Sequence, residues 1–232
     1  QSGEWIARSE MEAAAEAMTA MANLGLDPNV NERKVSKLEL ASNQDQAWKR
    51  LADANGGELG DAIEKLREEL NKFDGIPGVA VPKHLHATLR PYQQSGLEFL
   101  VYTSRLGLGA ILADDMGLGK TVQSLAWLEH LRVEQGQAPS LVVCPASVMF
   151  NWCREAEQFT PKLKVLLLTA GEQRHGLREE IPKHDLIITN YALLRRDLTA
   201  LKKFDFRAVI LDEAQNVKNP DSMVAKAARQ LQ

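Results

Sequence analysis

The sequence predicts an α/β fold in which a parallel sheet is covered by helices on both faces. Short, continuous apolar runs alternate with amphipathic helical patterns throughout residues 85–232, which is typical of such a sheet. One apolar run, residues 109–113, is followed by a loop containing glycine and then by a helical pattern. Another run ends in Asp212-Glu213, and ligands of open α/β sheets bind at the carboxyl ends of strands.

A small α-helical unit is expected to precede this fold, within residues 1–73. Helical patterns cover residues 4–24, 31–54 and 59–73, and the last has the most regular apolar spacing. The first carries a methionine stripe, which is more typical of packing than of a cofactor site. We therefore expect these helices to pack together or to bind a protein partner. Residues 74–84 contain two glycines and two prolines and are predicted to form a linker.

The elements of the second region follow in order along residues 85–232. The period of apolar residues and the flanking glycines and prolines decide between strand and helix in each case. Strands are predicted at residues 111–113, 141–144, 165–168, 186–189 and 208–211. Helices are predicted at residues 121–135, 148–159, 191–203 and 221–231.

Composition excludes several classes of protein. The net charge of −3 argues against a protein that coats nucleic acid without specificity. The two halves differ in charge: residues 1–85 carry 10 basic and 15 acidic side chains (net −5), and residues 86–232 carry 18 basic and 16 acidic ones (net +2). The second half can therefore hold a local basic face. The two cysteines, Cys144 and Cys153, lie in apolar surroundings and are expected to be buried free thiols. No apolar run is long enough to span a bilayer, so no membrane association is expected.

The first chemical signal is the stretch from Asp114 to Thr121, which has the form of a P-loop between a strand and a helix. Backbone N–H groups of such a loop and of the helix N-terminus bind phosphate oxygens. Lys120 would contact the β- and γ-phosphates, and the Thr121 hydroxyl would hold Mg²⁺. Asp114 departs from the strict pattern, which has glycine there, so an ordinary helix N-terminus is the alternative. The predicted nucleotide-binding residues of the loop are Asp115, Met116, Gly117, Leu118, Gly119, Lys120 and Thr121.

The second signal is Asp212-Glu213-Ala214-Gln215, at the end of the last predicted strand. Asp212 is expected to hold Mg²⁺ through its water shell, and Glu213 to orient and deprotonate the attacking water. Lys120, Asp212, Glu213 and Gln215 are the candidate catalytic residues. A solvated acidic pair at a strand end is the alternative, and the P-loop that precedes it in the same chain argues against that alternative.

A third signal, Gln93, precedes the first predicted strand within "LRPYQQSGLEFL". Its amide can donate and accept at once, as the edge of an adenine base requires. A glutamine exposed at a helix N-terminus is the alternative.

Five segments together resemble a known family: "LRPYQQSGLEFL", "ILADDMGLGKT", "LVVCPASVMFNWCREAEQF", "LIITNYALLRRD" and "VILDEAQNVKNP". They are similar to the adenine-binding motif and to motifs I, Ia, Ib and II of superfamily-2 helicase-like ATPases, specifically of the Swi/Snf type. An acidic residue at the position of Asp114 is common in that family. The resemblance covers about residues 85–232 and implies a RecA-like lobe that uses ATP and Mg²⁺.

The resemblance also implies partners. Family members translocate along double-stranded DNA and have a second RecA-like lobe whose arginines reach the γ-phosphate. The chain begins at Gln1 and stops before motif III, so we expect a fragment that binds ATP weakly and hydrolyses it little. Arginines of this kind contribute roughly 10³–10⁵ in rate in related enzymes.

Motifs Ia and Ib of the family grip the phosphate backbone of one DNA strand. The matching positions here are Pro145, Ser147, Asn151, Thr189, Asn190 and Tyr191. They lie at strand-to-helix turns, where backbone N–H groups suit phosphate binding. Trp152, beside them, is expected to be a core residue rather than a stacking platform.

Two other functions remain open from the sequence: an RNA-directed helicase lobe, and a P-loop module that binds a partner without turnover. The family's motifs I and II favour the DNA translocase over the RNA helicase. The absence of a secretion signal and of a nuclear-import cluster favours a bacterial cytoplasm or nucleoid, or the nucleus if the protein is eukaryotic.

Overall fold

The computed structural model describes residue 68, residues 73–171 and residues 174–231. The helices predicted over residues 1–73 lie outside this range, apart from Glu68 and Phe73. The chain divides into two compact units, Gln1–Ile76 with Thr103–Gly109, and Pro77–Tyr102 with Ala110–Gln232. The second unit contains the sheet and the residues predicted to carry the chemistry.

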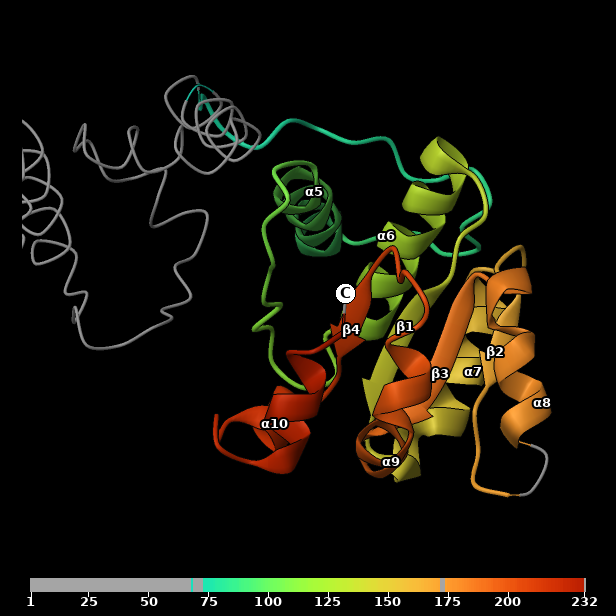
Figure 1. Ribbon diagram of the computed structural model, residues 1–232. Helices are drawn as coiled ribbons and strands as arrows, with labels where there is room; N and C mark the ends of the chain where they lie inside the picture. Colours follow the sequence, from blue (N-terminus) through green and yellow to red (C-terminus); the bar gives the residue numbers. More distant parts are fainter. Residues whose placement is uncertain (1–67, 69–72, 172–173, 232) are drawn as a thin grey trace, which may run out of the picture. The chain divides into compact units, whose positions relative to one another are not determined.

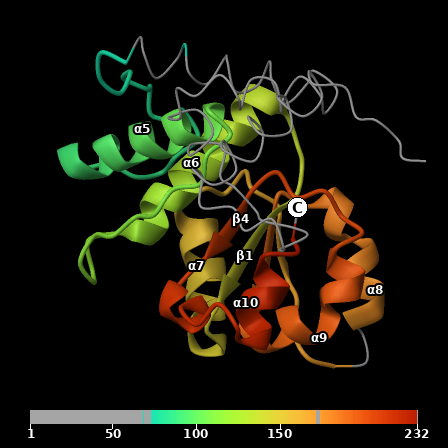
Figure 2. The same cartoon turned by 60° about the vertical axis from the view of Figure 1, so that its left-hand side comes forward.

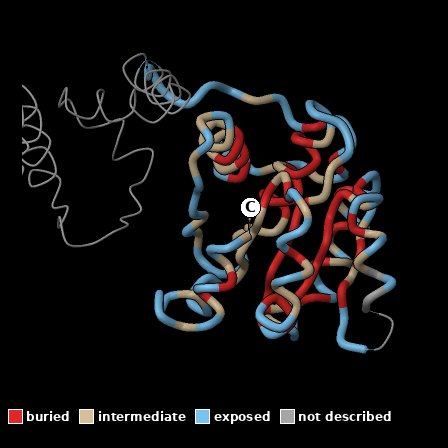
Figure 3. Tube along the Cα trace, viewed as in Figure 1, coloured by how far each residue is buried: buried red, intermediate tan, exposed pale blue. Residues whose placement is uncertain are grey.

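Four parallel strands form the sheet in the order β2-β3-β1-β4 (Figure 1). Val142 in the centre of β1 pairs with Ile188 of β3 and with Ile210 of β4. All five residues of β1 are buried, so a continuous apolar run suits this strand better than an alternating one (Figure 3). The bounds are Ser140–Cys144 for β1, Val165–Leu167 for β2, Leu186–Asn190 for β3 and Val209–Leu211 for β4. The predicted parallel sheet is thus confirmed.

Helices α6 (Lys120–Gln135) and α7 (Met149–Phe159) cover one face of this sheet. Val142 and Cys144 of β1 point to this side, because alternate residues of a strand face the same way. They pack with side chains of both helices in one core cluster, which includes Leu125, Leu128, Met149, Trp152 and Ala156.

The opposite face is covered by α9 (Tyr191–Leu201) and α10 (Met223–Ala228) (Figure 1). Leu141 and Val143, the intervening residues of β1, pack here with Tyr191, Leu194 and Ala227. Helices therefore lie on both faces, as predicted. The described residues of this unit also form α8 (Arg174–Glu179) and three short 3₁₀ segments, η1 (Ala146–Val148), η2 (Ile181–Lys183) and η3 (Ala214–Val217).

Helix α5 (Pro91–Arg105) lies beside α6 (Figure 2). Leu97 and Val101 pack against Leu85 and against Ala126 of α6, on the side of α6 that does not face the sheet. The residues of α5 up to Tyr102 belong to the second unit. Within the described residues, no helix is both long and apolar enough to cross a membrane.

The strand predicted at residues 111–113 was wrong. Residues 110–115 form neither strand nor helix, and the side chain of Ile111 is 82% exposed. A strand needs backbone hydrogen bonds from a neighbouring strand, and no described strand pairs with this segment in the order β2-β3-β1-β4. Its apolar residues alone therefore do not make it a strand.

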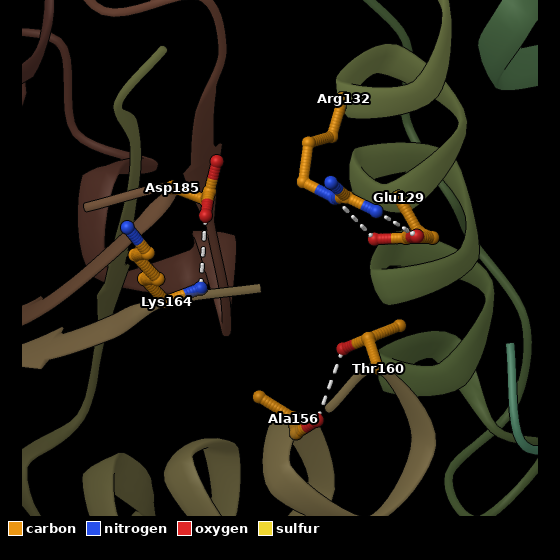
Figure 4. Close-up of polar contacts among 6 residues, drawn as sticks. All are labelled: Glu129, Arg132, Ala156, Thr160, Lys164 and Asp185. Carbon is orange, nitrogen blue, oxygen red and sulfur yellow. Dashed lines mark hydrogen bonds and ion pairs between the residues drawn. The ribbon is translucent and has the colours of Figure 1, made fainter. Parts of the chain in front are cut away.

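Figure 4 shows polar contacts of α6, of the end of α7 and of the residues that precede β2 and β3. Asp185, just before β3, accepts a hydrogen bond from the backbone N–H of Lys164, just before β2, at 2.9 Å. On α6 the fully buried Glu129 accepts two hydrogen bonds from Arg132, at 2.9 and 2.7 Å. Thr160 closes α7 by donating from its hydroxyl to the carbonyl of Ala156.

Candidate nucleotide-binding site

Three strand-to-helix turns lie at the carboxyl edge of the sheet, because β1, β3 and β4 are parallel and end there. They are the turns after Cys144, after Asn190 and after Leu211. Helix α6 runs antiparallel to β1, so its first turn points toward the same edge (Figure 1). The parts predicted separately from the sequence are therefore gathered at one edge.

The P-loop turns sharply at two glycines before α6 begins. Gly117 and Gly119 have φ angles of 81° and 80°, in the left-handed region that glycine adopts without steric cost. A Cβ on Gly119 would lie 2.6 Å from Nε2 of Gln93, so this position is also too close to α5 for a side chain. Glycine is thus favoured at both positions, by the backbone conformation at each and by the approach of Gln93 at Gly119.

Lys120 is the first residue of α6, and its ammonium group folds back over the loop. Nζ donates to the carbonyl oxygens of Asp114 at 2.7 Å and Asp115 at 3.0 Å. A bound phosphate would offer the ammonium group stronger, charged acceptors in the same region. Thr121 follows in the first turn of the helix and is half-buried, whereas Met116 at the tip of the loop is 88% exposed.

Asp114, which stands where a strict P-loop has glycine, has a structural partner. Its Oδ2 accepts a hydrogen bond from Nε2 of Gln123 at 2.8 Å. Gln123 is fully buried on α6, and its Oε1 has no hydrogen-bond partner among the residues that the structure describes. A Cβ on Gly96 of α5 would lie 1.8 Å from that oxygen. Sequence reasoning missed both residues: Gln123 follows the P-loop motif, and Gly96 stands inside the segment that resembles the adenine-binding motif, but no local pattern shows that the two residues meet.

Gln93 is buried near the start of α5, and the P-loop uses its amide. Nε2 donates to the carbonyl of Leu118 at 3.0 Å, and Oε1 accepts from the N–H of Arg90 at 2.9 Å. The hydroxyl of Tyr92 also donates to the carbonyl of Leu118, at 3.1 Å. A primary amide has two N–H donors and two lone pairs on oxygen. Nε2 of Gln93 also donates to the Tyr92 hydroxyl, at a longer 3.5 Å. One lone pair of Oε1 therefore remains for an adenine edge, and the N–H that now points to Tyr92 would be the donor, while Tyr92 is a loop-bracing residue that the sequence did not reveal.

Asp212 follows β4 and is held from several directions. Its Oδ2 accepts from the indole N–H of Trp152 at 2.8 Å, and its Oδ1 accepts from the N–H of Glu213 at 3.0 Å. Its backbone carbonyl accepts from the hydroxyl of Tyr191 at 2.6 Å. The two aromatic side chains come from α7 and α9, on opposite faces of the sheet. Trp152 is in the core, as expected, but it also binds the predicted metal-binding carboxylate.

Glu213 is the one non-glycine residue with positive φ among the described residues, at 53°. Such a backbone is uncommon for glutamate and concentrates at functional sites. It leaves the side chain exposed, with Oε2 accepting from Nε2 of Gln215 at 2.6 Å. Gln215 thus orients the carboxylate expected to activate water.

The negative charge of Asp212 helps to raise the pKa values of two neighbouring side chains, Cys144 and Tyr191. Burial, and then the charge of Asp212, raises the pKa of the Cys144 thiol to about 12. The same two causes raise the pKa of the Tyr191 hydroxyl, which therefore stays protonated and donates to Asp212. Burial raises the pKa of Glu155 as well, against the lowering effect of Arg154.

The residues present fit Mg²⁺ better than a metal bound by protein alone. No group of three or more histidine, cysteine or acidic side chains is placed to hold a metal within the described part of the chain. Mg²⁺ keeps several waters and binds through one or two carboxylates together with substrate phosphates. A single carboxylate from Asp212 and the Thr121 hydroxyl suit that mode of binding.

The residues predicted to contact nucleic acid differ in whether their side chains are exposed. Ser147 and Asn151 are exposed, whereas the side chains of Thr189 and Tyr191 are buried. Asn190 caps α9 by accepting from the N–H of Leu193, and so is used inside the fold. Pro145, which has no N–H, opens the turn before η1. Direct contact at these turns would therefore come from Ser147, Asn151 and backbone N–H groups.

Comparison with known proteins agrees with this geometry. The family model of the SNF2-related domain matches residues 92–232. The chain is 30% identical to the ISWI chromatin-remodeling complex ATPase CHR11 of Arabidopsis thaliana, covering 89% of this chain and 22% of that protein. It is 37% identical to the TATA-binding protein-associated factor MOT1 of Saccharomyces cerevisiae, covering 65% of this chain and 9% of that protein.

A solved structure is similar as well. The Sulfolobus solfataricus SWI2/SNF2 ATPase core in complex with dsDNA is 40% identical, with a TM-score of 0.62, and the match covers 67% of this chain and 32% of that one. The chain therefore spans less than a third of the length of each of these proteins.

Proposed function

The chain belongs to the SNF2-related family, and from this premise we propose that it is the ATP-binding, first RecA-like lobe of an ATP-dependent double-stranded DNA translocase. The observation that carries the proposal is the position of the P-loop helix and of Asp212-Glu213 toward one edge of a parallel sheet. Ligands of open α/β sheets bind at that edge.

Each residue of the site has a proposed part in ATP binding and hydrolysis. The N–H groups of the loop and of the first turn of α6 hold phosphate oxygens, and Lys120 moves from its carbonyl partners to the β- and γ-phosphates. Thr121 and Asp212 would hold Mg²⁺, which when bound would neutralise charge on the phosphates. Glu213 takes a proton from the attacking water, and Gln215 holds its carboxylate in place.

Double-stranded DNA is the proposed polymer. Support comes from the exposed turn residues Ser147 and Asn151 at the carboxyl edge and from the dsDNA complex of the similar Sulfolobus core. Backbone N–H groups at such turns bind phosphate without reading sequence, so binding should weaken steeply with salt. Competition between duplex DNA and duplex RNA of equal length tests this choice, and preference for RNA would favour an RNA-directed helicase instead.

The nucleotide site is tested by Lys120→Ala. Loss of the ammonium group should weaken ATP binding by at least about tenfold, or about 1.4 kcal/mol, in a titration with a fluorescent ATP analogue. Lys162→Ala removes a lysine from the exposed surface and is the matched control. Unchanged affinity in Lys120→Ala, with the fold retained, would instead indicate a module that binds a partner.

The hydrolytic role is tested by Glu213→Gln in the longest form of the protein that turns over ATP. The amide keeps the shape of the side chain but cannot accept the proton of the attacking water. ATP affinity should remain while turnover is lost. Glu157→Gln changes an exposed glutamate on α7 and should turn over ATP normally. Turnover by Glu213→Gln would show that another group activates the water.

A further inference from the structure

Asp212 is bound by aromatic side chains from two helices whose first residues adjoin the two turns predicted to contact nucleic acid. Trp152 lies in the first turn of α7, which follows the turn at residues 145–148. Tyr191 is the first residue of α9, directly after Asn190. Their bonds to Asp212 are 2.8 Å from the indole N–H and 2.6 Å from the phenol hydroxyl.

A further contact joins the two turns to each other. Nδ2 of Asn190 lies 3.4 Å from Sδ of Met149, the first residue of α7. Asn190 also caps α9, so a movement of either turn is passed to the start of both helices. The starts of α7 and α9 and the end of β4 are thereby linked by side chains at one edge of the sheet.

Packing makes this link stiff. Trp152 is 4% exposed and Tyr191 is 7% exposed, and each belongs to the core cluster on its own face of the sheet. Close-packed side chains transmit displacement rather than absorb it. A shift of α7 would therefore carry the indole N–H with it and would stretch or shorten its bond to Oδ2 of Asp212.

The two bonds act on different parts of Asp212. The indole N–H holds the carboxylate, and indole is a donor without an acceptor, so its role cannot be reversed. The phenol hydroxyl holds the backbone carbonyl, where the chain passes from β4 into the left-handed Glu213. One bond therefore orients the group expected to hold Mg²⁺, and the other orients the backbone that carries the expected base.

We propose that Trp152 and Tyr191 are positioning residues that couple the binding of nucleic-acid phosphate at the turns after β1 and β3 to the binding of Mg²⁺ and nucleotide at Asp212. This inference rests on the proposed function, because it assigns the communication between its two sites. Coupling of this kind is reciprocal: phosphate contact at the turns strengthens Mg-nucleotide binding by the same factor by which Mg-nucleotide strengthens DNA binding.

Two variants remove the bonds while keeping the rings. Trp152→Phe loses the indole N–H, and Tyr191→Phe loses the hydroxyl. Trp127→Phe on α6 and Tyr102→Phe on α5 repeat each change on helices other than α7 and α9, and they serve as matched controls. Thermal unfolding of all four variants shows whether the fold survives. Should Trp152→Phe fail to fold, Tyr191→Phe decides the outcome.

The first measurement is Mg²⁺ dependence. Fluorescent-nucleotide affinity is measured with excess Mg²⁺ and with EDTA, without DNA. Trp152→Phe should lose up to about tenfold in Mg²⁺-dependent affinity, as expected for a hydrogen bond to a charged group, while affinity in EDTA stays within about twofold. Packing damage alone would lower both affinities equally, and equal losses would overturn the positioning role.

The second measurement is the ratio of Mg-nucleotide affinities with and without a saturating DNA duplex. The wild-type chain and both controls should give a ratio above about three, and Trp152→Phe and Tyr191→Phe should bring it close to one. A ratio unchanged in both variants, or a wild-type ratio of one with DNA bound, overturns the coupling. Failure of the wild-type chain to bind duplex DNA overturns the proposed function, and the Mg²⁺ experiment then still decides whether Trp152 positions Asp212.

Discussion

Nε2 of Gln123 donates a hydrogen bond to Oδ2 of Asp114 at 2.8 Å, and this bond ties the start of the P-loop to the helix that the loop precedes. Gln123 is fully buried, one turn into α6. A glycine at position 114 would leave its N–H group without this acceptor, at a cost of about 1–3 kcal/mol for a buried polar group. The aspartate is therefore a structural part of this loop.

The polarity of this bond gives the first prediction. Gln123→Glu places a second carboxylate against Asp114, so ATP affinity and the unfolding temperature should both fall. Combining it with Asp114→Asn restores one donor and one acceptor in the opposite direction and should recover most of both losses. A double-mutant cycle on the free energy of unfolding should give a coupling of about 1 kcal/mol or more.

Gln158→Glu makes the same change on the exposed surface of α7 and should alter neither quantity. If the two single variants add without coupling, the bond between Asp114 and Gln123 does not hold the loop.

Gly96 gives a second prediction. Gly96→Ala places a methyl group where Oε1 of Gln123 now lies, 1.8 Å from the ideal Cβ. The Gln123 side chain is confined by burial, so it must turn away and release Asp114. We expect a loss of about 1–3 kcal/mol in the free energy of unfolding, measured by urea denaturation.

The added variant Gln123→Ala removes the atom that clashes with the new methyl group. The loss caused by Gly96→Ala should then become small in the Gln123→Ala background. An equal loss in both backgrounds would show that the clash is with another part of the fold.

The order of β1 to β4 and of α6, α7, α9 and α10 could be predicted because it depends on local patterns, whereas α5 and α8 were not predicted. Continuous apolar runs gave β1 to β4, and the glycine spacing gave the left-handed turns at Gly117 and Gly119. The strand at residues 111–113 was wrong because pairing depends on a neighbour, which no local pattern supplies. The bond from Trp152 to Asp212 could not be predicted either, since 60 residues separate them and an apolar helix face accounts for the tryptophan equally well.

Variants of Gln93 and Tyr92 can distinguish two roles: holding the P-loop in place and recognising the adenine base. Both donate to the carbonyl of Leu118, and Nε2 of Gln93 also donates to the Tyr92 hydroxyl at 3.5 Å. The amide of Gln93 is the group proposed to pair with the edge of adenine. Tyr92→Phe should lower the affinity for ATP and the affinity for inorganic tripolyphosphate by the same modest factor, about two- to threefold. Gln93→Ala should lower the affinity for ATP by about tenfold and the affinity for tripolyphosphate by a smaller factor. Competition titrations measure both ligands, and equal losses in Gln93→Ala would exclude adenine recognition by this residue.

Cys144 provides a prediction on pH. Burial and the charge of Asp212 raise its pKa from 9.0 to about 12, so the thiolate is scarce in the folded chain. At pH 8 the thiol should react with iodoacetamide at least about 10³-fold more slowly than in the urea-unfolded chain, since the thiolate is the reactive form. Mass spectrometry of the modified peptide measures the rate.

The same shift predicts a loss of stability at high pH. The raised pKa favours the protonated thiol in the folded state, so its contribution is complete below pH 9 and is lost as the pH rises toward 12. Cys144→Ala should therefore lose less stability than the wild type between pH 9 and pH 11. Parallel losses in the two proteins would contradict the raised pKa.

Glu129 and Arg132 form an ion pair on α6 (Figure 4). Removing one partner of this pair is expected to destabilise the fold. Glu129 is fully buried, while the Arg132 side chain is 24% exposed and donates to both carboxylate oxygens. Arg132→Met leaves the carboxylate buried without its partner and should cost about 2–4 kcal/mol, toward the lower end for buried pairs because Arg132 is partly solvated. Urea denaturation measures this loss.

Replacing both partners tests the reason for that cost. Glu129→Met together with Arg132→Met removes the buried charge as well as its partner, and the double variant should recover most of the loss. Lys183→Met breaks the pair of Lys183 and Glu180, whose side chains are 67% and 41% exposed, and should leave the unfolding midpoint unchanged. A double variant no more stable than Arg132→Met would show that the arginine stabilises α6 by packing rather than by neutralising Glu129.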